Sequence, residues 1–206
     1  MSKLEDTRQK ALDDLGESGV LMREGHFDYG NGYHGSVYLN PHQLFRRPST
    51  IWRFAQDLLD VLPATVVSST QVVVGPVTGG ALLAHTIAGL LDSRRSLTHP
   101  SCFFAPFHIS RSGGFLLRSF YGSELKGKRI LLADDVRNTG QTLAQCAALV
   151  KEVGGELIAT AEIYDRGNPL VALDVPNYAL ATFEAPENYP ANGCPLCKSG
   201  MPITSF

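Results

Sequence analysis

The sequence has almost no excess charge, few cysteines and no long apolar run. Eighteen basic and twenty acidic residues leave a formal net charge of −2, so there is no general basic field to hold a nucleic-acid backbone. No stretch of about eighteen apolar residues could span a bilayer, and the polar start from Met1 to Asp6 does not resemble a secretory signal. We therefore expect a cytoplasmic protein with neither nucleic acid nor membrane as a partner.

The four cysteines are too few for a disulfide framework in a chain of 206 residues. Cys102 and Cys146 lie in apolar stretches, where a reduced thiol behaves as a small hydrophobe. Cys194 and Cys197 form one Cys-x-x-Cys motif, which is half of a zinc ribbon or a redox pair. Zinc needs four ligands, and the nearest histidine in sequence, His108, is distant. No helix is expected directly after the motif to lower a thiol pKa, so a tight turn in a polar tail is the simplest interpretation.

The hydrophobic pattern predicts one α/β domain over residues 1–206. With 44% hydrophobic and 18% charged residues the chain can bury a sizeable core, and no internal repeat or linker supports a second domain. Helical spacing is found over 3–18, 48–62, 81–91 and 141–153, and strand-like runs over 71–74, 129–133, 157–164 and 178–183. Repeated strand–helix units imply a mostly parallel, twisted sheet with helices on both faces.

The stretch from Gly25 to Asn40 differs in composition from the rest of the chain. It is rich in Gly, His, Tyr and Asn, which suit turns and an exposed hairpin better than a core. It is a candidate ligand surface, and an ordinary hairpin with aromatic cross-strand pairs is the alternative.

A pair of acids follows the predicted strand at 129–133. Asp134 and Asp135 begin a predicted loop, from Asp134 to Gly140, that opens a helix. Ligands of parallel sheets bind at this edge, where backbone N–H groups and the Thr139 and Thr142 hydroxyls can hold a phosphate. Carboxylates would face a hydroxylated or cationic group, so a sugar phosphate is the natural ligand; simple helix capping by the acids is the alternative.

The string from Ile130 to Thr142 resembles the signature of the type I phosphoribosyltransferases. It departs from that signature at Arg137, usually apolar in the family, and at Asn138, usually Thr, Ser or Ala. The resemblance implies that Asp134 and Asp135 bind the ribose hydroxyls of phosphoribosyl pyrophosphate. It assigns the 5-phosphate to a loop made of Val136, Arg137, Asn138, Thr139, Gly140, Gln141 and Thr142.

Over nearly the whole chain the sequence is similar to the orotate branch of this family. The resemblance extends over residues 18–21, 25–27, 31–34, 38–40, 74–80, 116–118, 127–129, 163–166 and 194–202. It implies a small N-terminal hood, roughly residues 19–45, completed by the tail 184–206. In the turn at 74–80, Thr78, Gly79 and Gly80 would hold the pyrophosphate.

Three further residues are assigned to the base. By the same resemblance Arg166 meets the orotate carboxylate, for which its planar fork of donors is suited. Phe27 offers a stacking face, and Arg23 could add positive charge. A surface ion pair for Arg166 and a plain core position for Phe27 are the alternatives.

The reaction implied is transfer of a phosphoribosyl group to a nucleobase, orotate in this branch, within pyrimidine biosynthesis. Mg²⁺ is the implied cofactor and is held mainly through substrate oxygens; a homodimer is the implied assembly. The predicted catalytic residues are Asp134, Asp135 and Arg111. Arg111 is included because the loop from Phe107 to Gly114 lacks the lysine usual in the branch. His108 could share this role, and Gly79 stands where several relatives carry a further lysine.

Three alternatives remain open at this stage. The missing lysine permits a protein that binds phosphoribosyl pyrophosphate without turnover, or one with an altered, purine preference. An unrelated doubly wound hydrolase could also place two acids near a phosphate, and it would bind metal strongly without substrate. A redox role for Cys194 and Cys197 is the third alternative.

Overall fold

A computed structural model describes residues 3–29, 32–40, 42–95, 99–111, 113–167, 171–184, 186 and 188–205. Within these residues the central sheet has six strands in the order β10-β9-β8-β5-β6-β7. The strands are β5 (Val72–Pro76), β6 (Phe103–Ile109), β7 (Phe115–Leu116), β8 (Arg129–Arg137), β9 (Glu156–Asp165) and β10 (Asn177–Thr182). All neighbours are parallel except β6 and β7, which confirms the predicted sheet.

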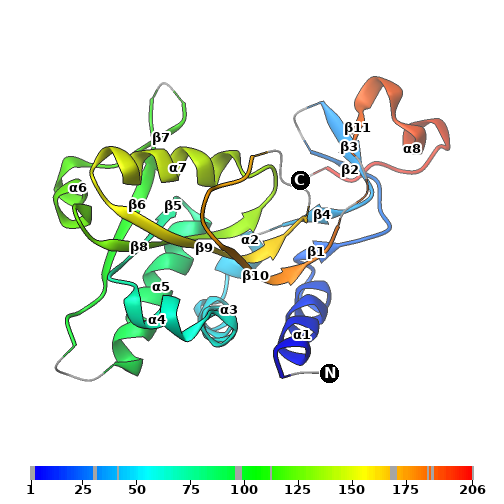
Figure 1. The fold of residues 1–206 in the computed structure, drawn as a ribbon. Coiled ribbons are helices and arrows are strands. Elements are labelled where there is room, and N and C mark those ends of the chain that lie inside the picture. Colours follow the sequence, from blue (N-terminus) through cyan, green and yellow to red (C-terminus); the bar gives the residue numbers. More distant parts are fainter. Residues whose placement is uncertain are drawn as a thin grey trace.

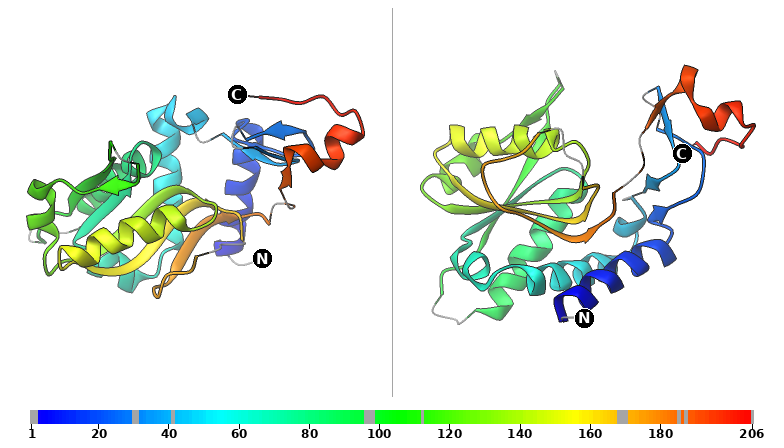
Figure 2. Two further views of the ribbon diagram at one scale, coloured as in Figure 1. Left: turned by 90° about the horizontal axis from the view of Figure 1, so that it is seen from above. Right: turned by 45° about the vertical axis from the view of Figure 1, so that its right-hand side comes forward.

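The middle strands are buried because helices cover both faces of the sheet (Figures 1 and 2). One face carries α1 (Lys3–Glu17), α3 (Pro48–Val61) and α5 (Gly79–Arg94); the other carries α6 (Ser119–Leu125) and α7 (Gln141–Glu152). Two short helices, α2 (His42–Phe45) and α4 (Ala64–Ser69), flank α3. In the described parts of the chain, no helix is long and apolar enough to cross a membrane.

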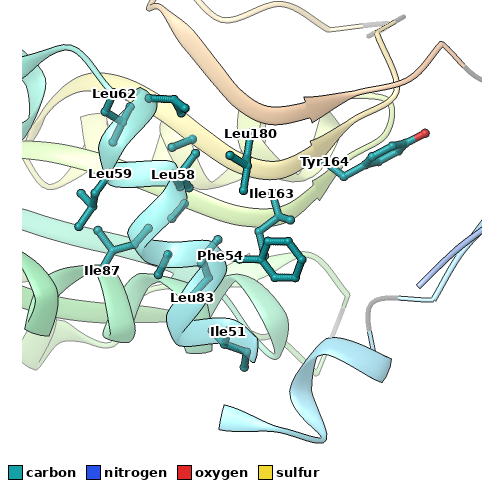
Figure 3. Close-up of a cluster of buried hydrophobic side chains, with 14 of the residues drawn as sticks. Ile51, Phe54, Leu58, Leu59, Leu62, Leu83, Ile87, Ile163, Tyr164 and Leu180 are labelled. Atoms are coloured by element: carbon teal, nitrogen blue, oxygen red, sulfur yellow. The ribbon is translucent and has the colours of Figure 1, made fainter. Parts of the chain in front are cut away.

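The larger of two buried clusters lies between α3, α5 and the sheet (Figure 3). Phe54 and Leu58 of α3 pack with Leu83 and Ile87 of α5, and all four side chains are fully buried. Burying a side chain of this size stabilises a fold by about 1.5–3 kcal/mol. This cluster therefore fixes α5, whose first residues form one wall of the site described below.

The hood consists of short strands beside the carboxyl edge of the sheet. β1 (Leu21–Met22) pairs with β4 (Tyr38–Leu39). A separate three-stranded sheet has the order β11-β3-β2 and contains β2 (Phe27–Asp28), β3 (Tyr33–Gly35) and β11 (Tyr189–Pro190). The antiparallel pairing of β2 with β3 confirms the hairpin predicted for residues 25–40. The tail continues through η1 (Ala191–Gly193) and α8 (Pro195–Lys198) beside this sheet.

Two predicted boundaries are wrong. The loop expected from Asp134 begins later, because β8 continues to Arg137 by pairing Val136 with Tyr164 and Arg137 with Asp165 of β9. The stretch from Phe107, expected as a loop, continues strand β6 to Ile109. Pro106 weakens the strand signal there, because proline cannot donate to a strand ladder. Asn31 of the predicted hood and Ser112 of the predicted loop lie outside the described residues.

Candidate active site

Two cavities at the carboxyl edge of the sheet share Val136 as a wall. One, of about 270 Å³, lies between the glycine turn and the acid pair. The other, of about 340 Å³, lies between the end of β9 and the hood. Because Val136 lines both, the two cavities adjoin, and together they are called the cleft below.

The acid pair forms the floor of the first cavity. Asp134 is buried and Asp135 half-buried. Asp134 Oδ1 accepts a hydrogen bond from the Asp135 amide at 2.9 Å, and Asp135 Oδ1 accepts one from the Val136 amide at 2.9 Å. Burial, reinforced by the neighbouring Asp135 carboxylate, raises the pKa of Asp134 well above its ordinary value. A cation or a set of hydroxyl donors in the cavity would relieve this unfavourable charge.

The glycine turn lies directly against these acids. A Cβ at Gly79 would meet Asp135 Oδ2 at 2.1 Å, and one at Gly80 would meet Asp134 Oδ1 at 2.7 Å. Gly75 is equally constrained, since its Cβ would lie 2.2 Å from the carbonyl oxygen of Gly80. Absence of side chains therefore leaves the first turn of α5 open toward the cavity. The first N–H groups of a helix lack partners within it and favour an anion.

The start of α7 forms a second corner of the site, with a geometry suited to an anion. Gly140 precedes the helix with φ +83°, a left-handed conformation that favours glycine. The Gln141 amide donates to Thr139 Oγ1 at 3.4 Å, and Thr142 lines the first cavity. The phosphate loop predicted from the sequence thus opens a twelve-residue helix beside the acid pair.

The Arg137 side chain does not face this corner, which corrects the phosphate contact predicted for it. Its guanidinium donates to Asp165 Oδ2, and its Nε lies 3.6 Å from Glu162 Oε1. The side chain is only 16% exposed. Arg137 therefore neutralises carboxylates within the sheet, and only its backbone belongs to the loop region.

The Glu162 carboxylate explains why an arginine replaces the apolar residue usual in the signature. Glu162 is fully buried and accepts from Asn177 Nδ2 at 2.5 Å. Burial raises its pKa to about 8 despite that hydrogen bond and the nearby Arg137. A buried carboxylate requires a partner, and Arg137 supplies one from the neighbouring strand β8, where it lies opposite Asp165.

Arg166 lies at the entrance of the second cavity. Its guanidinium donates to Asn138 Oδ1 and to Asn188 Oδ1, each at 3.2 Å. Asn138 belongs to the signature and Asn188 to the tail, so one cation joins the two. Both of these contacts are neutral amides, and among the described residues no carboxylate is paired with Arg166, whose charge can therefore meet a carboxylate ligand.

Aromatic rings form the walls of this cavity. Tyr29 and Tyr38 are stacked, with ring centroids 6.1 Å apart and planes 15° apart. Tyr29 donates its hydroxyl to the Val37 carbonyl at 2.6 Å, and Tyr164 donates to the Phe183 carbonyl at 3.0 Å. Since the hydroxyls have partners, the rings offer mainly their faces, which suit a planar ligand.

Phe27 and Arg23 lie away from the position expected for them. Phe27 is only 5% exposed and packs against Tyr38 with centroids 5.7 Å apart. Arg23 lies over the Phe183 ring at 4.4 Å. Neither is among the described residues that line the cavity. The tyrosine content of the hood was the available signal for Tyr29 and Tyr38, and no local pattern indicated Asn188.

Arg111 occupies the connection between β6 and β7. The two strands form a hairpin in which His108 pairs with Leu116, and Arg111 is exposed near its end. Phe115 of the same hairpin lines the first cavity. Among the described residues, Arg111 does not line the cleft. It can contact a ligand there only if the hairpin moves toward the cleft, or if it reaches the cleft of another subunit.

Cys194 and Cys197 lie outside the cleft, beside the hood. They meet His26 and His34 there, with all four ligand atoms within 4.8 Å of one another. The expectation of a cysteine pair without histidines in a polar tail is therefore wrong: the histidines come from the other end of the chain. A single helical turn, α8, lies within the motif and ends at Lys198, and no helix begins after Cys197 in the described tail.

Comparison with known proteins identifies relatives of this fold and site. The family model of the phosphoribosyl transferase domain matches residues 51–191. Orotate phosphoribosyltransferase of Caulobacter vibrioides is 32% identical over 197 residues, covering 96% of this chain and 94% of the relative. The enzyme of that name from Thermotoga maritima is 32% identical over 190 residues, covering 91% and 92%.

Solved structures agree in fold at lower sequence identity. Orotate phosphoribosyltransferase from Aeropyrum pernix superposes with a TM-score of 0.63 at 22% identity, covering 82% of this chain and 92% of that one. Adenine phosphoribosyl transferase from Trypanosoma brucei gives 0.60 at 18% identity, covering 88% and 82%. From the matched family model and the extent of the sequence relatives, this chain belongs to the phosphoribosyl transferase family.

Proposed function

We propose that this protein transfers the phosphoribosyl group of phosphoribosyl pyrophosphate to orotate, forming orotidine 5′-phosphate and pyrophosphate. The observation that carries the proposal is the pair of adjoining cavities, with the acid pair and glycine turn in one and Arg166 in the other. The relatives named orotate phosphoribosyltransferase support orotate as the base.

In this proposal the first cavity binds phosphoribosyl pyrophosphate. The carboxylates of Asp134 and Asp135 accept hydrogen bonds from the ribose hydroxyls. The 5-phosphate binds at the start of α7, where Thr142 and backbone N–H groups donate. The diphosphate binds at the start of α5, where Gly79 and Gly80 leave backbone N–H groups accessible.

The second cavity binds the base. Arg166 donates two parallel hydrogen bonds to the orotate carboxylate, and the rings of Tyr29 and Tyr38 contact the pyrimidine. A ring nitrogen of orotate then lies on the Val136 side, toward the sugar. This nitrogen forms the new bond to the anomeric carbon while the bond to the pyrophosphate oxygen breaks, and the proton it carried passes to the departing pyrophosphate. Holding both reactants in one cleft lowers the entropic cost of this step.

Charge develops at two places during the transfer. The ribose gains positive, oxocarbenium-like character, which the adjacent Asp134 and Asp135 carboxylates stabilise. The departing pyrophosphate gains negative charge, which the N–H groups at the start of α5 stabilise. Preorganised groups of this kind account for a large share of catalysis.

The acid pair also fits a magnesium cofactor. Its carboxylate oxygens are the hard ligands that Mg²⁺ prefers, and the raised pKa of Asp134 indicates a place where a cation relieves charge repulsion. Bound through substrate oxygens beside Asp134 and Asp135, Mg²⁺ would neutralise negative charge on the diphosphate.

Arg111 completes the proposed catalytic set as a member of a homodimer. Its exposed position on the β6–β7 hairpin allows it to reach the diphosphate of a neighbouring subunit. Sedimentation of the wild type tests the dimer. Mixing Arg111→Ala subunits with Asp135→Asn subunits tests the shared site, since partial recovery of activity is expected only if one subunit supplies Arg111 to the other.

A panel of bases tests the assignment of substrate. Product formation is measured with phosphoribosyl pyrophosphate, Mg²⁺ and, separately, orotate, adenine, hypoxanthine and uracil. Turnover on orotate alone is expected, with a reduced rate for Arg111→Ala. Turnover restricted to a purine would defeat the proposal.

One observation favours a second candidate, a phosphoribosyl pyrophosphate-binding protein without turnover. The described residues of the β6–β7 hairpin include no lysine, and position 79 is glycine. Tight binding of phosphoribosyl pyrophosphate with no pyrophosphate release from any base would select this candidate over the transferase.

A further inference from the structure

We propose that His26, His34, Cys194 and Cys197 bind one zinc ion, which fastens the C-terminal tail to the hood. The four residues lie outside the cleft and none lines either of its cavities. The inference therefore does not depend on the proposed function.

The distances among the four ligand atoms match the edges of a tetrahedron around zinc. His26 Nε2 lies 3.1 Å from His34 Nδ1, 3.6 Å from Cys194 Sγ and 3.7 Å from Cys197 Sγ. Cys197 Sγ lies 3.4 Å from His34 Nδ1. With Zn–N near 2.0 Å and Zn–S near 2.3 Å, tetrahedral geometry requires N···N edges of about 3.3 Å and N···S edges of about 3.5 Å.

The hydrogen bond of His26 orients its ring for metal binding. Its Nδ1 lies 2.8 Å from the carbonyl oxygen of Met201. A carbonyl can only accept, so Nδ1 carries the hydrogen and a neutral ring presents the lone pair of Nε2 to the cluster. Zinc-bound histidines usually have such a partner on the other ring nitrogen.

The backbone holds the two ligand pairs together from opposite ends of the chain. Thr204 donates to the His26 carbonyl at 2.8 Å and its carbonyl accepts from the Asp28 amide at 3.0 Å, so the tail runs alongside β2. Gly200 has φ +76° and donates to the Cys197 carbonyl at 3.1 Å, which closes the turn after the second cysteine.

The chemistry of the four side chains selects zinc over other metals. Two thiolates and two neutral imidazoles balance the charge of a divalent ion, and tetrahedral sulfur–nitrogen sites are typical of structural zinc. Binding replaces the thiol protons of both cysteines, which pass to solvent. Three of the residues are buried and Cys197 is exposed, so the ion has a path to enter.

The ion would stabilise the hood and the second cavity. His34 is paired with Tyr189 in the β3–β11 ladder, and the preceding residue, Asn188, contacts Arg166. Without zinc, the tail would lose its metal link to the hood and would be held by this short ladder and by single hydrogen bonds such as those of Asn188, Ala191, Met201 and Thr204. A lower melting temperature and faster proteolysis of residues 184–206 are expected in the zinc-free protein.

Metal analysis of the full chain, purified without a metal-binding tag or added metal, tests the proposal. One zinc per chain is expected by plasma mass spectrometry. In Cys194→Ser and Cys197→Ser the content should fall at least tenfold, whereas Cys102→Ser, which changes a thiol outside the cluster, should retain it. Less than a tenth of an equivalent in the wild type, before and after incubation with zinc, would overturn the proposal.

X-ray absorption of the wild type provides a test that needs no variant and survives misfolding of the cysteine mutants. Two sulfur neighbours near 2.3 Å and two nitrogen neighbours near 2.0 Å are expected. A shell of nitrogen and oxygen alone would contradict the site. A second result would also contradict the site. It is a Cys194–Cys197 disulfide, detected by intact-mass measurement, in protein that is freshly prepared under reducing conditions and contains no zinc.

Discussion

Arg166 donates to Asn138 Oδ1 across 3.2 Å, and so joins the end of β9 to the signature loop that follows β8. The backbone reinforces this contact, because the Arg166 amide donates to the Arg137 carbonyl at 3.1 Å. Parallel strands end at the same edge of a sheet. Two neighbouring strands thereby place the predicted base contact beside the predicted sugar-phosphate site.

Replacing Arg166 by lysine should weaken orotate binding selectively. Lysine keeps the charge but cannot donate two parallel hydrogen bonds to a carboxylate. We expect the KM for orotate to rise about 10- to 100-fold, equivalent to roughly 1.5–3 kcal/mol, with a much smaller change in the KM for phosphoribosyl pyrophosphate. Steady-state kinetics with each substrate varied in turn checks this.

Arg23→Lys is the matched control for that experiment, since Arg23 packs on Phe183 outside the cavity. An equal rise in the orotate KM in both variants, or none in Arg166→Lys, would contradict the role assigned to Arg166.

A methyl group at Gly79 should damage the sugar-phosphate half of the cleft. The added Cβ would meet Asp135 Oδ2 at 2.1 Å and Phe45 at 2.2 Å, so the carboxylate must move. We expect kcat/KM for phosphoribosyl pyrophosphate to fall at least about tenfold, a loss of ~1.4 kcal/mol in the transition state. Gly89→Ala in the same helix meets nothing within 4 Å and should instead stabilise the protein by about 0.5–1 kcal/mol. Unchanged kinetics in Gly79→Ala would show that the turn does not border the reacting group.

Arg137→Ala should be a stability mutation rather than a binding mutation. It leaves the Asp165 carboxylate without its cationic partner, and breaking a buried pair in this way costs about 3–5 kcal/mol. Urea unfolding measures the loss. Adding Asp165→Asn to the same chain should restore part of the stability. A large rise in the KM for phosphoribosyl pyrophosphate, with unchanged stability, would instead indicate that Arg137 contacts the phosphate.

Glu162 should make the stability of the protein fall as pH rises. Its pKa is raised from 4.5 to about 8, so the native state holds a proton that the unfolded chain releases between these values. Its contribution is complete below about pH 4.5 and is lost through pH 8, with a slope of up to ~1.4 kcal/mol per pH unit. Unfolding free energies of the wild type, Glu162→Gln and the exposed Glu156→Gln, measured from pH 5 to 8, check this. Only Glu162→Gln should flatten the dependence of the unfolding free energy on pH. Parallel curves for all three proteins would refute the role assigned to Glu162.

The sequence predicted the parts of the site that are local. The apolar run before Asp134 and the glycine turn at Gly79 each mark a strand end followed by a helix, and parallel topology brings these ends to one edge. The acid pair and the turn accordingly meet in one cavity.

The remaining features depend on contacts between distant segments. The direction of the Arg137 side chain is set by carboxylates on β9, which no pattern within the signature reveals. The meeting of His26 with Cys194 joins residues 168 positions apart, and only the pairing of the tail with the hood brings them together. Phe27 was expected to face the ligand, but burial behind Tyr38 places other rings there.

Calorimetric titration with phosphoribosyl pyrophosphate in the presence of Mg²⁺ tests the central claim most directly, because it requires no assumption about the base. Saturable binding at one site per chain is expected for the wild type. In Asp135→Asn the affinity should fall at least about tenfold, while the melting temperature is preserved or raised. An absence of heat from the intact wild-type protein, or equal affinity in Asp135→Asn, would contradict the claim.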